Sequence, residues 1–263
     1  MTVMRRHRAI GRSVAGVVLL AAGVALGACS DDDDNTNSAG SSTTEAADQT
    51  STTASSTTAV SQGCSDPAPE MSQPANTGEI VDIDGDGRRD TAWLASPTSG
   101  GRELGVLTAA GGGDRVMIDS ASPVALTLLV ADADEQPPVE LFVSDNRTVQ
   151  LWTFVDCSLQ PVTDTRGQPY QFDLGFRGTG TGVGCIDADG DGRRDLVGLN
   201  VTATTDTTVE WSRTIIERDG VQASNGPTDT GTYRRSEDDA EIELLYTVTC
   251  GDASIDQDGI RQP

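Results

Sequence analysis

Short apolar runs separated by clusters of Gly, Pro and Asp dominate the chain beyond residue 64. Runs of this length, rich in β-branched and aromatic residues, are typical of strands connected by tight turns. Asp219-Gly220 is one such turn, and no segment in this part combines a helical apolar stripe with capping residues. The pattern predicts an all-β domain over 64–263, with strands that include 104–108, 124–130, 149–155, 208–211 and 242–248.

The first 28 residues follow a different pattern. An apolar run at 14–26 comes after four positively charged residues, Arg5, Arg6, Arg8 and Arg12. The run is too short for the roughly 20 residues that a membrane-spanning helix needs, but it suits the apolar region of a signal peptide. It ends in Leu26-Gly27-Ala28-Cys29, which resembles the bacterial lipobox.

This resemblance implies a lipoprotein signal peptide at 1–28 that is removed before Cys29. The thiol of Cys29 would carry a diacylglyceryl group and the new N-terminus a further chain such as palmitate, which together suffice for stable anchoring. The expected place is the cell envelope, on the outer face of the cytoplasmic membrane. An ordinary signal peptide, cleaved after Ala28 with a chance Cys, is the alternative.

Residues 29–63 contain the acylated Cys29 and a linker rich in Ser and Thr that opens with an acidic run at 31–34. The linker has no aromatic residue. Because so little apolar surface cannot offset the entropy of ordering, we expect a disordered spacer between the bilayer and the folded domain.

The composition of the chain excludes several classes of function for the domain. The chain carries 41 acidic against 18 basic residues, a formal net charge of −23, and no Lys. Its single His, His7, lies in the predicted leader. Such an acid excess repels phosphate backbones, so we expect no nucleic-acid partner. A mature chain without His or Lys cannot form a Ser-His-Asp triad, a Schiff base or an imidazole-bound zinc site.

Four cysteines remain once Cys29 is assigned to lipid. An even number in an exported domain indicates two disulfides, with three possible pairings. We favour the pairs Cys64–Cys250 and Cys157–Cys185, because the first would join the two ends of the domain.

Two segments, 81–90 and 186–195, match almost residue for residue. Each presents Asp at loop positions 1, 3, 5 and 9, with Gly at position 6 for a sharp turn. Ca²⁺ takes 6–8 oxygen ligands, and alternate side chains of a tight loop can point at one centre. The sequence therefore predicts two Ca²⁺ sites, with the backbone carbonyls of Arg88 and Arg193 at position 7 as neutral ligands. The carboxylates are Asp82, Asp84, Asp86 and Asp90 in one site and Asp187, Asp189, Asp191 and Asp195 in the other.

The same spacing begins an EF-hand, but an EF-hand requires Glu at position 12 and flanking helices. Position 12 is Trp93 in one copy and Gly198 in the other, and apolar strand-like residues follow both loops. The EF-hand is thereby excluded. The remaining alternative is an acidic turn that binds no metal.

A third, eroded copy at 130–143 keeps acids at positions 1, 3 and 9, which are Asp132, Asp134 and Glu140. Gln136 and Pro137 replace the third Asp and the turn Gly, so we expect this loop to fold alike and bind metal poorly. A fourth and weaker copy occupies 237–246. The last acids recur about every 50 residues, which suggests a small or atypical β-propeller-like repeat domain of about four blades. A β-sandwich with two calcium loops is the alternative fold.

The two strong copies resemble the calcium loops of FG-GAP/VCBS repeats, which occur in integrin α-like propellers and in bacterial surface proteins. The resemblance is strong at 82–94 and 187–199, partial at 132–143, and weak for the Phe-Gly portion near 175–182. It implies that calcium is structural and that partners bind on other, loop-rich faces.

Together these features predict a lipid-anchored, extracytoplasmic, non-catalytic binding or scaffold module whose partner is an envelope protein or a glycan. A carboxylate-dependent hydrolase and a calcium-responsive envelope sensor are the alternatives. Asp173 is the hydrolase candidate, although a solvent-facing acid at a strand edge is its simpler interpretation. We expect Trp93, Trp152 and Trp211 to pack in the core.

Overall fold

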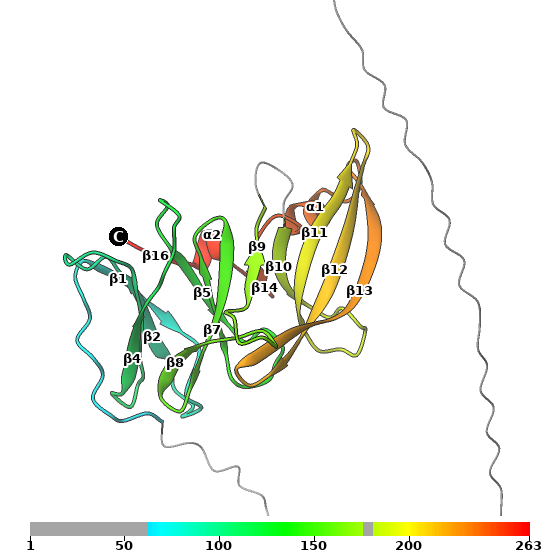
Figure 1. Ribbon diagram of the computed structural model, residues 1–263. Coiled ribbons are helices and arrows are strands. Elements are labelled where there is room, and N and C mark those ends of the chain that lie inside the picture. The colour runs from blue at the N-terminus through cyan, green and yellow to red at the C-terminus, as the bar shows by residue number, and fades with distance from the viewer. Residues whose placement is uncertain (1–62, 176–180) are drawn as a thin grey trace, which may run out of the picture. The chain divides into compact units, whose positions relative to one another are not determined.

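A computed structural model describes residues 63–175 and 181–263. Strands dominate both ranges and form several antiparallel sheets, none of which closes into a barrel (Figure 1). The prediction of an all-β domain is thus confirmed. The predicted signal peptide, the lipidation site Cys29 and the linker up to residue 62 lie outside the described residues. No helix in the described ranges has the length and apolar character required to cross a membrane.

The first sheet consists of four strands paired in chain order. Trp93 in the second strand is 1% exposed and lies against Gly105, where a Cβ would be only 2.0 Å from the indole ring. Its indole N–H donates to the buried carboxylate of Glu103 at 3.0 Å, so the predicted core role of Trp93 is confirmed. The strands are β1 (Ala75–Ile80), β2 (Asp90–Ala95), β3 (Glu103–Leu107) and β4 (Gly113–Met117).

The middle sheet has the order β16-β5-β6-β7-β8, and β9 pairs with β7 beside β8. Its first strand in the order comes from the C-terminus of the chain. The predicted strand at 149–155 corresponds to β7, whereas the one at 124–130 begins three residues later than expected. The strands are β5 (Thr127–Ala131), β6 (Glu140–Ser144), β7 (Thr148–Val155), β8 (Ser158–Pro161), β9 (Gln171–Asp173) and β16 (Ile260–Arg261).

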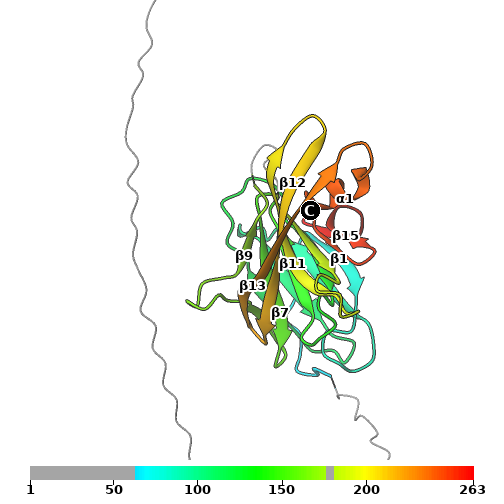
Figure 2. The ribbon, with the colours of Figure 1, turned by 90° about the vertical axis from the view of Figure 1, so that its right-hand side faces the viewer.

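The third sheet again pairs four strands in chain order and has the longest strands. Its last two strands, of 12 and 13 residues, form a long hairpin (Figure 2). Gly220, with φ +58°, lies in the predicted turn between them. Beyond that turn, Ala223 donates to the Thr163 carbonyl, so the hairpin tip contacts the segment after β8. The strands are β10 (Thr181–Ile186), β11 (Asp195–Thr204), β12 (Thr208–Asp219) and β13 (Gln222–Arg234).

The prediction of a fourth copy of the repeat at 237–246 is wrong. It contains the helix α1 (Asp239–Leu244) instead of a loop and a strand, so the strand predicted at 242–248 is wrong as well. Asp239 and Glu241 in the first turn favour a helix start, and Ala240 and Leu244 favour helix over strand. The chain then forms a small β14 (Thr249–Cys250) and β15 (Ala253–Ser254) pair and the short α2 (Ile255–Asp258).

The core lies on both faces of the middle sheet. Successive residues of β6 point to opposite faces, so Leu141 packs against the first sheet and Phe142 against the third. This two-sided burial explains the continuous apolar run in β6, all five residues of which are buried. Trp152 packs against the cluster facing the first sheet, and Trp211 joins the cluster between the third sheet and α1.

All four candidate cysteines form disulfides, but the predicted pairing is wrong. The pairs are Cys64–Cys157 and Cys185–Cys250. Cys157 lies in the turn between β7 and β8, next to the start of the domain, while Cys250 in β14 lies beside β10, which carries Cys185. Each bridge therefore links neighbouring sheets or segments, and neither joins the two ends of the domain.

The C-terminal tail, and not a disulfide, connects the end of the domain to its first sheet. The Gln262 side chain donates to the Ala95 carbonyl of the first sheet at 2.9 Å, and its carbonyl oxygen accepts from the Leu126 N–H. The Asn76 amide donates to the Arg261 carbonyl. Hydrogen bonds from the tail thus join the first and middle sheets.

Candidate metal centre

Three acidic loops occupy equivalent places in the three sheets. The first loop (82–90) joins β1 to β2, the middle loop (132–140) joins β5 to β6, and the third loop (187–195) joins β10 to β11. In each case the last acid of the loop is the first residue of the following strand: Asp90 of β2, Glu140 of β6 and Asp195 of β11. The expectation that the eroded copy leads into a strand like the other two is confirmed.

One hydrogen bond closes all three loops. The carboxylate at position 9 accepts the backbone N–H of position 2, from Ile83 to Asp90 at 2.7 Å, from Ala133 to Glu140 at 2.8 Å and from Ala188 to Asp195 at 2.9 Å. A hydrogen bond to a carboxylate is stronger than one between neutral groups. The acid at position 9 therefore fixes the loop shape, even in the eroded copy.

The glycines of the first and third loops allow the chain to coil around the position 1 carboxylate. Gly85 and Gly87 have φ values of +77° and +83°, a region that other residues enter only at a cost. Their N–H groups both donate to Asp82, at 2.8 and 2.7 Å. Asp187 accepts the equivalent pair of hydrogen bonds in the third loop.

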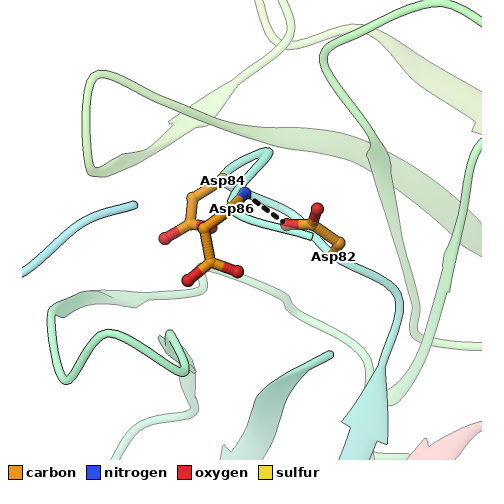
Figure 3. A group of neighbouring side chains, drawn as sticks. All are labelled: Asp82, Asp84 and Asp86. Atoms are coloured by element: carbon orange, nitrogen blue, oxygen red, sulfur yellow. Dashed lines mark hydrogen bonds between the residues drawn. The ribbon is translucent and has the colours of Figure 1, made fainter. Parts of the chain in front are cut away.

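The first loop brings together three of its four predicted carboxylates. Asp82, Asp84 and Asp86 each offer an oxygen, and these oxygens lie within 4.8 Å of one another (Figure 3). Oxygens bound to one Ca²⁺ at about 2.3–2.6 Å can be at most about 5 Å apart, so this set fits a calcium ion. Hydrogen bonding to Arg88 lowers the pKa of Asp86 and keeps that carboxylate charged.

Asp90 has a different role from the other acids of the first loop. It is 1% exposed, and its two oxygens accept the N–H groups of Ile83 and Ala109, each at 2.7 Å. Burial raises its pKa, and the two hydrogen bonds oppose that rise. In the described structure Asp90 holds the loop closed and lies outside the converging group.

The third loop also brings together three carboxylates, but a different three. Asp187, Asp189 and Asp195 offer oxygens within 4.8 Å of one another. Asp191 accepts the N–H of Arg193 at 2.8 Å and lies outside the group. The carbonyl groups of Arg88 and Arg193 remain predicted ligands.

The middle loop folds like the other two, as its sequence suggested. Its acids Asp132, Asp134 and Glu140 converge within the same 4.8 Å as those of the other loops. A guanidinium group from the third sheet enters this cluster: Arg218 of β12 forms ion pairs with Asp134 and Glu140. Sequence reasoning missed Arg218, because nothing near it in the chain links it to a loop about 80 residues earlier.

Burial and charge oppose each other in the middle loop. Burial raises the pKa of Glu140 to about 8, while Arg218 and the Ala133 N–H act to lower it. Burial also acts to lower the pKa of Arg218, but the hydrogen bonds that Arg218 donates to Asp134 and the charge of Glu140 outweigh it and raise that pKa. The guanidinium therefore stays positively charged among these acids.

Asp173, the candidate for a hydrolase, lies exposed at the end of β9. One of its oxygens accepts the Gly175 N–H at 2.8 Å. This arrangement agrees with the simpler interpretation, an acid at a strand edge that faces solvent.

Comparison of the chain with protein-family models, with curated proteins and with solved structures finds no match.

Proposed function

We propose that this chain is a calcium-stabilised, non-catalytic binding or scaffold module held outside the cytoplasmic membrane by a lipid anchor. The first and third loops would each bind one Ca²⁺. The observation that carries this proposal is the convergence of three carboxylate oxygens in each of two loops with nearly the same sequence.

The donor chemistry supports calcium over other ions. The converging ligands of both loops are carboxylate oxygens only, which favour hard cations such as Ca²⁺ and do not favour zinc or copper. Three carboxylates held within 4.8 Å repel one another, and a divalent ion would relieve that repulsion. Because each loop joins the first two strands of a sheet, a bound ion would stabilise the sheet.

The repeat proposal follows from the same loops. Three sheets each begin with a strand, an acidic loop and a second strand, as FG-GAP/VCBS repeats do. We propose that the sheets are three blade-like units of this kind, in place of the four that the sequence period suggested. The partner, an envelope protein or a glycan, would bind a surface away from the calcium loops.

The proposed location rests on the leader and on the cysteines. The lipobox-like sequence at Cys29 would attach the chain to the membrane, and the Ser/Thr-rich linker would hold the domain away from the bilayer. Two disulfides in one domain agree with an oxidising compartment.

Thermal unfolding of the full chain in detergent, with excess EDTA or with excess Ca²⁺, tests the calcium proposal. Extracellular calcium modules have dissociation constants of about 10⁻⁴–10⁻³ M, and an ion at about 100 times that constant adds about 2.7 kcal/mol per site. The expected result is a Tm higher by several degrees in Ca²⁺.

The double variant Asp84→Asn with Asp189→Asn should lose most of this shift. A matched control replaces two exposed acids outside the loops, Asp206→Asn with Asp252→Asn, and should keep it. Equal Tm values in EDTA and in Ca²⁺ for the wild-type chain would rule out structural calcium.

A further inference from the structure

Arg218 makes a bidentate contact with Asp134 of the middle loop. Its Nε donates to one oxygen of Asp134 and its Nη2 to the other, both at 3.0 Å. This paired geometry is the strongest that arginine and a carboxylate can form, and lysine cannot reproduce it. Arg218 comes from β12 of the third sheet, so the contact also joins two sheets.

Two of the remaining contacts of Arg218, with Pro138 and Glu140, fall on oxygens that the calcium pattern assigns to a metal. Its Nη2 donates to the carbonyl oxygens of Gln136 and Pro138, each at 3.2 Å, and forms an ion pair with Glu140. Asp134, Pro138 and Glu140 occupy positions 3, 7 and 9. These are the positions that supply two carboxylates and the carbonyl in a complete calcium loop.

The Arg218 cluster is buried. The side chains of Arg218, Asp134 and Glu140 are 3%, 15% and 0% exposed. A charged group removed from water is costly unless it is paired and hydrogen-bonded, so the guanidinium and the acids of this loop each require the other.

Two arginines of the third loop also reach the middle loop. Arg194 donates to the Asp132 carbonyl at 3.0 Å and pairs with Glu135, and Arg193 donates to the Glu135 carbonyl at 3.3 Å. The equivalent arginines of the first loop, Arg88 and Arg89, pair instead with Asp86 and Glu79 of their own sheet unit. Among the described residues, the middle loop is thus the one of the three loops that arginines of a neighbouring sheet contact.

We propose that Arg218 is an internal cation that takes the place of the divalent ion in the middle loop. This loop would then be complete without metal, and removal of Arg218 would turn it into a divalent-cation site. The comparison with Ca²⁺ rests on the proposed function, whereas the contacts of Arg218 do not depend on it.

The first test compares Arg218→Ala with Arg166→Ala in the full chain in EDTA. Arg166 pairs with Asp164 at 2.6 Å, but its side chain is 82% exposed, so it is a matched surface pair. Loss of Arg218 should lower Tm by about 10 °C and loss of Arg166 by no more than about 2 °C. Asp134→Asn in the Arg218→Ala chain should restore part of the loss, since it removes a charge that has lost its partner.

The second test measures the Tm shift on addition of Ca²⁺. If Arg218 had only a structural role, its removal would leave this shift unchanged. The Tm of Arg218→Ala should rise by several degrees more than the Tm of the wild-type chain. Arg218→Lys, which keeps the charge and is expected to fold, should show the wild-type calcium shift together with an intermediate Tm in EDTA.

The outcomes separate this proposal from the calcium proposal. An extra calcium shift in Arg218→Ala supports the internal cation even where the wild-type chain shows none, a result that would defeat only the calcium sites of the first and third loops. Equal shifts in both chains would overturn the internal cation. So would a Tm loss for Arg218→Ala that matches Arg166→Ala. If Arg218→Ala does not fold in EDTA, recovery of a folding transition on addition of Ca²⁺ supports the proposal, and no recovery at saturating Ca²⁺ overturns it.

Discussion

The first and middle loops have the same closing hydrogen bond but different surroundings. Asp90 and Glu140 both accept the N–H of position 2, and both are buried. In the first loop Asp86 pairs with Arg88 of the loop itself, whereas in the middle loop Arg218 of another sheet pairs with Asp134 and Glu140. Loop shape and source of positive charge are therefore separate properties of these loops.

This difference explains how the middle loop can lose part of the calcium pattern and keep its fold. Its Gln136 and Pro137 remove a carboxylate and a turn glycine, yet Glu135 adopts a positive φ of 57°, close to the +77° of Gly85 at the same position of the first loop. The hydrogen bond to Glu140 still closes the loop. Substitutions that test the two loops in parallel should therefore have unequal effects.

The largest expected difference is between Glu140→Ala and Asp90→Ala. Glu140→Ala removes one of the two carboxylates that pair with the buried Arg218 guanidinium and leaves the Ala133 N–H without its acceptor, which should reduce the free energy of unfolding by about 3–5 kcal/mol. Asp90→Ala leaves two backbone N–H groups without an acceptor and should cost about 2–3 kcal/mol. Urea unfolding in EDTA at pH 9, above the Glu140 pKa of about 8 and so with that carboxylate charged, measures both, and equal losses would contradict the proposed role of Arg218.

The Cys64–Cys157 disulfide is the next largest effect and concerns the first loop. The N–H of Cys64 donates to Asp84 at 2.7 Å, so this bridge holds the start of the domain against a predicted calcium ligand. Replacing both cysteines by Ala should cost about 2–4 kcal/mol.

The same variant should weaken Ca²⁺ binding at the first loop and leave the third loop unchanged. Replacing Cys185 and Cys250 by Ala is the matched control for stability, because that bridge lies in another part of the fold. Calcium titration by calorimetry measures the affinities, and an unchanged pair of sites in Cys64→Ala with Cys157→Ala would argue against the link.

The most gradual effect is a pH dependence specific to the middle loop. The folded-state pKa of Glu140, about 8, lies above the ordinary value of 4.5, so its contribution to stability is present below about pH 4.5 and is lost as pH rises through about 8. The wild-type chain should lose stability relative to Glu140→Gln across this window. The slope is at most about 1.4 kcal/mol per pH unit. Parallel pH curves for the two chains in EDTA would contradict this shift.

The sequence predicts the local parts of this architecture well. Alternating apolar residues and turn glycines locate strands such as β3 and β7, and the spacing of acids locates all three loops. These features depend on residues close together in the chain, where periodicity and turn chemistry act directly.

The parts that fail depend on contacts between distant segments. Cys157 meets Cys64 only because the β7–β8 turn lies beside the start of the domain, and Arg218 meets Glu140 only because β12 extends to the middle sheet. The misassigned helix α1 is a different failure. Its local signals, acids in the first turn with Ala240 and Leu244, favour a helix, whereas the spacing of acids along the chain favoured a fourth loop and strand.

A crystal structure of the chain grown with Ca²⁺ tests the central claim most directly. The account predicts one ion in the first loop and one in the third, each bound by the converging carboxylates, with the Arg218 guanidinium in the middle loop. An ion in the middle loop with Arg218 displaced would contradict it. So would the absence of ion density from both the first and the third loop at saturating Ca²⁺.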